Sequence, residues 1–329
     1  MKKFASIVLS AVFALTLLAG CGGAPSSAPA SASGAAASGQ QPYKVGLIQL
    51  MEHTSLDEIR AAIEAQLDET LGAGNYTYDY QNGQNDPTTM MSICQKFAAD
   101  GVDVIIAIAT PAAQSAAAVV EGTGIPVVFS AVTDPVAAEL VDSLDAPGGQ
   151  ITGTSDAIPV ENIFDLAQEL TPDMASVGVL YCTGEPNSAS VVAQTKTCLE
   201  AKGLRFEESA VTNSSEVQTA AQNLLAKCDA LFVPIDNTVA GAMSVVAAEA
   251  IKAGKPLYVA ADSMVRDGAL ASVGVNYTNL GKQTADMAVR ILQGGDPAAM
   301  PVEVLKDANV VVNEETAAAV GVDVSKYAQ

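Results

Sequence analysis

Apolar residues recur with two alternating periods along residues 43–312. Short runs rich in β-branched residues, such as 104–109, are followed by longer Ala-rich stretches, such as 112–121, whose apolar positions have helical spacing. This alternation is typical of parallel strands joined by crossover helices. The pattern predicts strands at 44–50, 76–81, 104–109, 127–131, 177–181, 205–211, 230–234, 257–260 and 271–275, and helices at 55–71, 88–99, 112–121, 188–201, 216–226 and 239–253.

One strand, helix and strand pattern occurs in both halves of the chain. Residues 102–106 lead through 109–111 and a helix to 124–128, and residues 228–232 lead through 236–238 and a helix to 254–258. We therefore predict an α/β fold of two Rossmann-like open parallel-sheet lobes joined by hinge strands. The first lobe would comprise 43–156 with about 277–301, and the second 157–276 with about 302–329. A helix at 279–293 and strands at 302–305 and 310–312 would cross back between the lobes, at points that the sequence does not fix.

The amino terminus has the pattern of an export signal. Two lysines precede an apolar run at 4–18, which is shorter than the roughly 20 residues of a membrane-spanning helix. The run ends at Leu18-Ala19-Gly20-Cys21, which resembles the lipobox of bacterial lipoproteins and implies cleavage before Cys21 and a diacylglyceryl group on it. An ordinary secretory signal is the alternative. Residues 1–20 would be the signal peptide and residues 21–42, rich in Gly, Ala, Ser and Pro, a disordered tether. The body would then lie outside the cell membrane, anchored by lipid.

The composition limits the classes of partner that the chain is expected to bind. Acidic side chains number 37 and basic ones 16, and removal of Lys2 and Lys3 with the leader brings the net charge to about −23, which argues against nucleic acid and anionic lipid as partners. One His in the whole chain argues against a nitrogen-rich metal site, and we expect no metal and no cofactor. The remaining cysteines match no zinc or redox spacing and are expected to be free buried thiols, although export leaves a bridge between the second and third of them open: Cys94, Cys182, Cys198 and Cys228.

Motifs of common enzyme classes are missing from the sequence. No Gly-rich phosphate loop with its Lys occurs, and no Ser lies in a Gly-x-Ser-x-Gly elbow. Catalysis by paired carboxylates remains formally open, but nothing in the sequence selects such a pair. We therefore expect a binding protein and not an enzyme.

Polar residues follow several predicted strands, at the edge where open α/β sheets bind ligands. Thr110, with the amides of Ala112 and Ala113, begins an Ala-rich helix, and a helix start suits a carboxylate because its N–H groups lack intrahelical partners. Thr133 follows the next strand and would assist. The alternative is that Thr110, like Ser155 and Thr238, only caps a helix or forms a turn.

Two acids are candidates for binding an ammonium group. Asp156 and Asp236 follow predicted strands, and a cationic amine in a desolvated cleft needs anionic or acceptor partners. Asn237 and Thr238 would complete that loop, and His53 would line or gate the pocket. Each has a plainer alternative: a crossover residue for Asp156, a helix cap for Asp236, and a loop-stabilising residue for His53. Apolar walls could come from residues that serve equally well as core, namely Met51, Phe129, Phe164 and Tyr181.

A set of short segments over about residues 43–312 resembles one family, the substrate-binding lipoproteins of ABC transporters of the tryptophan/tyrosine-binding type, which are similar in fold to type I periplasmic binding proteins. The segments are Glu52-His53-Thr54-Ser55-Leu56-Asp57, Gln81-Asn82-Gly83-Gln84-Asn85-Asp86, Ala109-Thr110-Pro111-Ala112-Ala113-Gln114, Val132-Thr133-Asp134-Pro135, Pro147-Gly148-Gly149-Gln150-Ile151-Thr152-Gly153, Pro234-Ile235-Asp236-Asn237-Thr238 and Gly268-Ala269-Leu270-Ala271.

The resemblance implies a function and a partner. It implies a monomeric solute-binding component of an ABC importer, which takes an amino acid, including aromatic ones such as tryptophan, in the cleft between its lobes and docks on an ABC permease. The sequence departs from relatives at Thr54 and Ser55, where they usually carry Pro and Ala, and at Gly83-Gln84-Asn85-Asp86, where they carry Ala-Gln-Gly-Asp. The alternatives are a sensor that passes its ligand state to a receptor and, from another class, a surface hydrolase with carboxylates.

Overall fold

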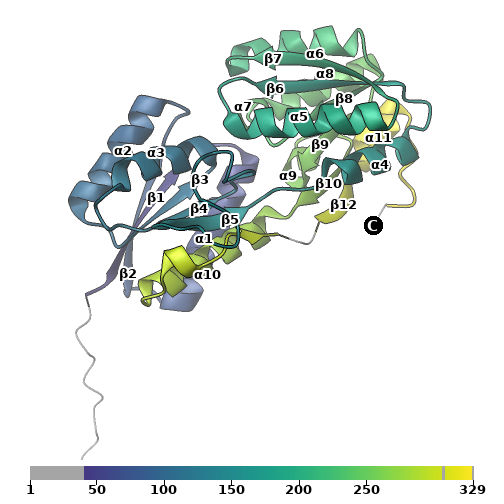
Figure 1. Ribbon diagram of the computed structural model, residues 1–329. Coiled ribbons are helices and arrows are strands. Elements are labelled where there is room, and N and C mark those ends of the chain that lie inside the picture. The colour runs from purple at the N-terminus through teal and green to yellow at the C-terminus, as the bar shows by residue number, and fades with distance from the viewer. Residues whose placement is uncertain (1–40, 306–307, 328–329) are drawn as a thin grey trace, which may run out of the picture. The chain divides into compact units, whose positions relative to one another are not determined.

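The computed structural model describes residues 41–305 and 308–327. The signal peptide and most of the tether expected from the sequence lie outside these residues. Among the described residues, no helix is long and apolar enough to cross a membrane. Residues 41–329 form one compact unit, which contains two six-stranded sheets, each with helices on both faces (Figure 1).

The first lobe is built on a wholly parallel sheet with the strand order β11-β5-β4-β3-β1-β2. Helices α1 and α10 pack together on one face, and α2 and α3 pack together on the other (Figure 1). The strands are β1 (Tyr43–Gln49), β2 (Tyr76–Asn82), β3 (Val104–Ile108), β4 (Val127–Ser130), β5 (Ile151–Ser155) and β11 (Glu303–Val304), and the helices are α1 (Thr54–Leu71), α2 (Pro87–Asp100), α3 (Thr110–Val120) and α10 (Tyr277–Leu292).

The second lobe repeats this plan with the strand order β12-β10-β9-β8-β6-β7, in which β12 alone runs antiparallel. Its strands are β6 (Ser176–Cys182), β7 (Arg205–Val211), β8 (Ala230–Val233), β9 (Leu257–Ala261), β10 (Ala271–Val275) and β12 (Ala308–Val312). Its helices are α4 (Val160–Leu170), α5 (Pro186–Ala201), α6 (Val217–Leu225), α7 (Asn237–Ala240), α8 (Met243–Ala253), α9 (Asp262–Arg266) and α11 (Glu314–Val320), with a 3-10 turn at Ser214–Glu216 in this lobe and another at Pro297–Ala299 after α10.

Continuous apolar runs form the central strands because both faces of a parallel sheet are covered by helices. Every residue of β3 is buried, and so is every residue of β8. Close packing of the helices needs small residues at specific points. A Cβ on Gly281 in α10 would lie 2.6 Å from the carbonyl oxygen of Ile59 in α1, so glycine lets the two helices approach. The α/β fold class predicted from the sequence is confirmed.

The chain passes between the two sheets three times. It leaves the first sheet after β5, returns through Asn276 into α10, and leaves again between β11 and β12. The strand β11 pairs with β5 of the first sheet, and residues 306–307 are outside the described part.

Most predicted elements are present, with bounds that differ by a few residues. The helix predicted at 239–253 is two helices, α7 and α8, with Gly241 and Ala242 between them. The sequence reading missed β5, α4, α9 and α11.

The four cysteines of the body are buried free thiols, so the predicted free state holds and the possible bridge between Cys182 and Cys198 is absent.

Candidate ligand-binding site

Thr110 lies where the sequence placed it, at the first turn of α3 directly after β3. Its side chain is 2% exposed, and its Oγ1 has no hydrogen-bond partner among the described residues. The preceding residue, Ala109, has a φ of +79°, a left-handed conformation that alanine rarely adopts. A strained backbone therefore leads into a helix start that presents a buried hydroxyl with hydrogen-bonding capacity unused.

Only part of the amide set expected beside Thr110 is available. The Ala113 N–H donates to the Ala109 carbonyl at 3.0 Å, because Ala109 is the N-cap of α3. That amide is already used within the helix, and its expected contact with a ligand stays a prediction. The amides of Thr110 and Ala112 lie in the first turn, where helix geometry leaves N–H groups without intrahelical partners.

Asp156 is fully buried and hydrogen-bonded within the protein. The hydroxyl of Thr133 donates to its Oδ1 at 2.8 Å, and the hydroxyl of Tyr277 donates to its Oδ2 at 3.3 Å. Burial raises the pKa of Asp156 to about 6, because a low-dielectric environment disfavours the charged form. Thr133 and Asp156 are thus brought together, but as partners of each other. The Thr133 hydroxyl proton is already engaged.

Asp236 is also fully buried and accepts three bonds. As N-cap of α7 it accepts from the Val239 N–H at 2.9 Å, and its other oxygen accepts from the Cys182 N–H at 2.6 Å and the Ser188 hydroxyl at 2.7 Å. Burial, and then the nearby carboxylate of Glu185, raise the pKa of Asp236 to about 7. The capping alternative raised from the sequence therefore describes its present contacts.

Glu185 is a residue of this region that sequence reasoning missed. It is 2% exposed and precedes Pro186 at the start of α5. Its Oε2 accepts from the backbone and side-chain N–H groups of Asn237 at 2.9 and 2.6 Å, and its Oε1 accepts from the backbone N–H and the hydroxyl of Thr238 at 2.7 and 2.8 Å. Its position in the loop after β6 was the signal that could have found it, because the other candidates were selected on the same rule.

Three hydrogen bonds join the first lobe to the second near the carboxyl ends of their strands. His53 Nε2 lies 3.1 Å from Asn237 Oδ1, and the Asn85 amide donates to the Thr238 hydroxyl at 3.4 Å. The Ser190 hydroxyl of α5 donates to Asp134, in the loop after β4, at 3.0 Å. Of the predicted site residues, His53 and Asn237 are thus in direct contact across the lobes, and Thr238 of the same helix, α7, contacts the first lobe through Asn85.

Burial lowers the pKa of His53, and its hydrogen bond with Asn237 partly offsets that effect. The other ring nitrogen, Nδ1, is shielded from solvent and has no partner among the described residues. A buried polar atom without a partner is rare in folded proteins and calls for an explanation. His53 therefore resembles Thr110 in holding an unused hydrogen-bonding position.

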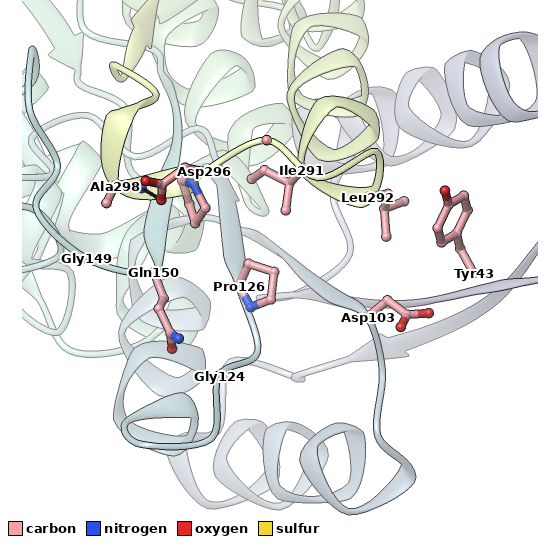
Figure 2. Close-up of a pocket in the computed structure, with 12 residues that line it drawn as sticks. Tyr43, Asp103, Gly124, Pro126, Gly149, Gln150, Ile291, Leu292, Asp296 and Ala298 are labelled. Carbon is pink, nitrogen blue, oxygen red and sulfur yellow. Dashed lines mark hydrogen bonds between the residues drawn. The ribbon is translucent and has the colours of Figure 1, made fainter.

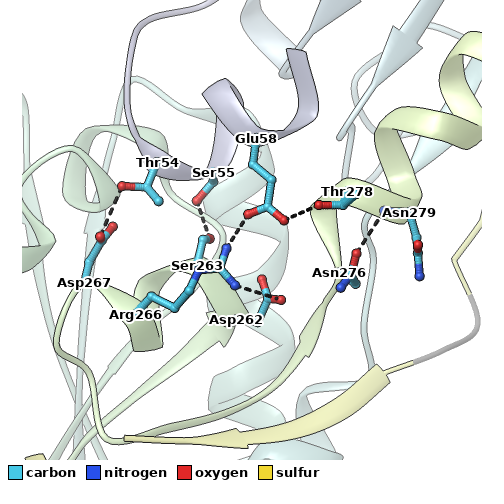
Figure 3. A network of polar contacts seen from close by, with 10 residues as sticks. All are labelled: Thr54, Ser55, Glu58, Asp262, Ser263, Arg266, Asp267, Asn276, Thr278 and Asn279. Atoms are coloured by element: carbon cyan, nitrogen blue, oxygen red, sulfur yellow. Dashed lines mark hydrogen bonds and ion pairs between the residues drawn. The ribbon is translucent and has the colours of Figure 1, made fainter. Parts of the chain in front are cut away.

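A second group of contacts joins the start of α1 to α9 and to the start of α10 (Figure 3). The hydroxyls of Ser55 and Ser263 are 2.6 Å apart, and Thr54 donates to Asp267 at 3.1 Å. Glu58 pairs with Arg266 and accepts from Thr278 at 2.6 Å. Since α1 belongs to the first lobe and α9 to the second, this network ties the lobes beside the crossing at Asn276.

The proposed apolar walls separate into core and surface contributions. Phe129 and Phe164 are completely buried core residues, and the ring of Phe164 packs edge-to-face on Phe232 at 5.1 Å. Tyr181 is half-buried and donates to Glu208 at 3.3 Å. Met51 differs, because a Cβ placed on Gly241 of the second lobe would lie 3.2 Å from its methyl group. Met51 is thus the one of the four whose described contact reaches the other lobe.

A surface cavity of about 600 Å³ lies at the opposite edge of the first sheet (Figure 2). It is lined by residues at or before the amino-terminal ends of strands, including Tyr43, Asp103, Pro126 and Gln150, and by Asp296 after α10. Ligands of open α/β sheets bind at the carboxyl ends of strands. This cavity is therefore not the candidate site.

Two α/β lobes with polar loops facing each other at strand ends define a two-lobed solute-binding protein. The chain matches the model of a family described as ABC transporter substrate binding protein over residues 44–327, and it belongs to that family. A tyrosine-binding protein of Clostridioides difficile (strain R20291) is 35% identical over 317 residues, which cover 96% of this chain and 91% of that protein. The family consists of solute-binding proteins, so the chain is not an enzyme.

Solved structures agree with this assignment. An ABC domain from Streptococcus pneumoniae in complex with L-Trp is 35% identical and superposes with a TM-score of 0.83, covering 86% of this chain and 96% of that one. A ligand-free, open substrate binding protein from Clostridium difficile is 39% identical with a TM-score of 0.67, covering 85% and 95%. A solute binding protein from Bacillus halodurans with bound myo-inositol is 16% identical, with a TM-score of 0.64 over 86% and 99%, and shares the fold. Substrate-binding proteins of ABC importers work outside the cytoplasm. Membership of this family implies a small-molecule ligand and a permease partner.

Proposed function

We propose that this chain binds an amino acid, most favourably an aromatic one, between its two lobes and delivers it to the permease of an ABC importer. The observation that carries the proposal is the buried Thr110 hydroxyl, which has no partner among the described residues at the start of α3. A hydroxyl and two helix-terminal amides form a suitable site for a carboxylate. The relatives named for tyrosine and crystallised with L-Trp support an aromatic amino acid as the ligand.

Asp156 and Asp236 remain the proposed partners of the ammonium group, together with the loop of Asn237 and Thr238. Both acids accept hydrogen bonds from the protein, so an ammonium would add to or replace existing donors. Ligand contacts to loops of both lobes would favour the arrangement in which those loops meet, which couples binding to lobe closure. The proposed lobe boundaries are the three crossings after β5, at Asn276 and after β11.

The test is a binding screen of the purified protein against the common amino acids by thermal shift, followed by calorimetry on every positive. A ligand at 100 times its dissociation constant adds about 2.7 kcal/mol to the free energy of unfolding, which a melting curve detects. We expect L-tryptophan or L-tyrosine to give the largest shift. A screen in which no amino acid stabilises the protein, while another class of metabolite does, would overturn the proposal.

We further propose that a lipid on Cys21 anchors the protein on the outer face of the cell membrane and that the protein acts as a monomer. Two acyl chains are sufficient for stable anchoring. The variant Cys21→Ser should be released into the medium, and mass spectrometry of the membrane-bound wild type should find diacylglyceryl on the terminal cysteine. Retention of the variant in the membrane would contradict the anchor.

A further inference from the structure

The carboxylate of Glu185 fixes the orientation of the Asn237 side chain. The Asn237 Nδ2 donates to Glu185 Oε2 at 2.6 Å, and the Asn237 backbone N–H donates to the same oxygen at 2.9 Å. If the amide were turned over, its oxygen would face a carboxylate oxygen, and two acceptors would oppose each other without a proton. Glu185 therefore holds the Asn237 Oδ1 toward the other lobe, where it lies 3.1 Å from His53 Nε2.

The orientation of Asn237 determines which nitrogen of His53 carries the proton. An amide oxygen is an acceptor only, so Nε2 must be the donor of this bond. In the neutral imidazole, Nδ1 is then a bare acceptor. It does not cap its own helix, because the N-cap residue His53 makes no side-chain bond to α1, and it has no partner among the described residues although it is shielded from solvent.

We propose that Glu185, acting through Asn237, holds His53 as the Nε2–H tautomer so that its Nδ1 accepts a hydrogen bond from an N–H or O–H group of the bound amino acid. The inference rests on the proposed function for the identity of the ligand, but the tautomer is a property of the free protein. Glu185 is a positioning residue in this arrangement, and His53 is a specificity-determining one. A ligand without a donor at this point would leave the buried Nδ1 unpaired, which is how binding sites discriminate most strongly between similar molecules.

The charged groups that face His53 come from three elements. They are Glu185 at the start of α5, Asp57 in α1 and Asp267 after α9, and all three favour the protonated ring, while burial opposes protonation more strongly and lowers the pKa of His53. Protonation would convert Nδ1 from an acceptor to a donor. The contribution of His53 to binding is therefore expected to be constant near neutral pH and to weaken as the pH falls through the lowered pKa of the ring.

Nitrogen-15 NMR of histidine-labelled protein tests the tautomer directly. The chain contains one His, so a sample without a polyhistidine tag gives one imidazole and needs no assignment. We expect the Nε2–H form in the free protein. Addition of L-tryptophan or L-tyrosine should move the Nδ1 resonance upfield, as an imine-type nitrogen does when it accepts a hydrogen bond. Observation of the Nδ1–H form in the free protein would overturn the proposal.

Calorimetry on the same samples separates this inference from the proposed function. If an amino acid binds and the Nδ1 resonance stays where it was, the contact with the ligand is refuted and the function stands. If no amino acid binds, the proposed function fails and the ligand contact fails with it, while the tautomer is still read from the free protein.

The variant Glu185→Gln tests the positioning role. A glutamine can donate to the Asn237 oxygen, which allows the Asn237 amide to turn over and present its NH₂ to His53. We expect a detectable fraction of the Nδ1–H tautomer and a loss of amino-acid affinity of about 10-fold or more. The control Glu216→Gln changes an exposed glutamate that bonds locally to Thr212 and should alter neither. An unchanged tautomer and affinity in a folded Glu185→Gln protein would contradict the role, and if that variant does not fold, the wild-type spectra alone decide.

Discussion

The substitution Thr110→Val should change folding stability and ligand affinity in opposite directions. Valine replaces the hydroxyl with a methyl group of similar size and keeps the branched Cβ. Because the Thr110 hydroxyl is 2% exposed and has no partner in the described structure, its removal relieves the cost of a buried, unsatisfied polar group. That cost is about 1–3 kcal/mol, so the ligand-free variant should unfold at a higher urea concentration than the wild type, by about 1 kcal/mol in the free energy of unfolding.

The same change should weaken binding of the amino acid. A hydrogen bond from a hydroxyl to a charged carboxylate contributes about 1.5–3 kcal/mol, and each 1.4 kcal/mol is about a factor of ten in the dissociation constant. Calorimetry with L-tryptophan or L-tyrosine should therefore show affinity lowered by about 10- to 100-fold. A stabilised protein that binds worse identifies a residue whose polar group is kept for the ligand.

Thr195 provides a matched control within the same chain. It lies inside α5, is completely buried, and its hydroxyl also has no partner among the described residues. Thr195→Val should raise stability by a similar amount and leave affinity unchanged. A Thr110→Val protein that is less stable and binds as tightly as the wild type would refute the reasoning, because it would mean that the hydroxyl has a structural partner such as an ordered water.

Three further perturbations have defined outcomes. Burial raises the pKa of Asp156 to about 6 in the folded protein, above its ordinary value. The contribution of its proton to the free energy of unfolding is therefore fully present below pH ~4 and is lost as the pH rises through about 6. Asp156→Asn should remove this pH dependence, at most about 3 kcal/mol, from free energies of unfolding measured with urea. Gly281→Ala places a Cβ 2.6 Å from a backbone carbonyl oxygen in α1 and should destabilise by about 1–3 kcal/mol in chemical denaturation, whereas Gly149→Ala meets open space and should be neutral. Arg266→Gln removes a half-exposed ion pair between the lobes and should weaken amino-acid binding by less than ~1 kcal/mol in calorimetry, with a smaller effect at high salt. The control Lys326→Gln breaks an ion pair within the second lobe and should leave the affinity unchanged.

The sequence predicts much of the fold because the strands of a parallel sheet that helices cover on both faces are continuous apolar runs in the sequence. The strands β7 and β10 have the same bounds in the sequence reading and in the structure. The helix α4 was missed although its signal is present: Val160, Ile163, Phe164 and Ala167 are buried at helical spacing.

The strand β5 could not be predicted in the same way. Its sequence, Ile151 to Ser155, is rich in hydroxyls and contains a glycine, which is typical of a loop. Tertiary contacts account for both features. The Thr152 hydroxyl donates to the Met300 carbonyl at 2.8 Å, and a Cβ on Gly153 would lie 2.1 Å from the carbonyl oxygen of Phe129. Partners distant in sequence thus satisfy the hydroxyls and require the glycine, and no local pattern contains that information.

The sequence predicted where the candidate site residues lie relative to the strands, but not their hydrogen-bond partners. The rule that ligands bind at carboxyl ends of strands selected Thr110, Asp156 and Asp236 equally, since all three are polar residues after strands. Only the structure separates them, because the two acids are hydrogen-bonded to other residues of the protein, whereas the Thr110 hydroxyl has no partner among the described residues. Glu185 was not among the predicted residues, and its burial depends on four donors at the start of α7, about 50 positions later, which no local pattern contains.

The difference between hydrogen-bonded and unpaired polar groups bears on how the proposed site would recognise an amino-acid zwitterion. The buried carboxyl groups of Asp156 and Asp236 accept hydrogen bonds from the protein, so they are stabilised whether or not a ligand is present. Among the predicted site residues, two atoms lack a partner in the described structure, Thr110 Oγ1 and His53 Nδ1, and both belong to neutral groups. Desolvating a neutral hydroxyl or imidazole costs far less than desolvating an unpaired carboxylate, so the empty protein can shield these atoms at small cost in stability. Discrimination then comes from the ligand, because a molecule that fails to supply an acceptor at Thr110 or a donor at His53 leaves a buried polar atom unpaired in the complex.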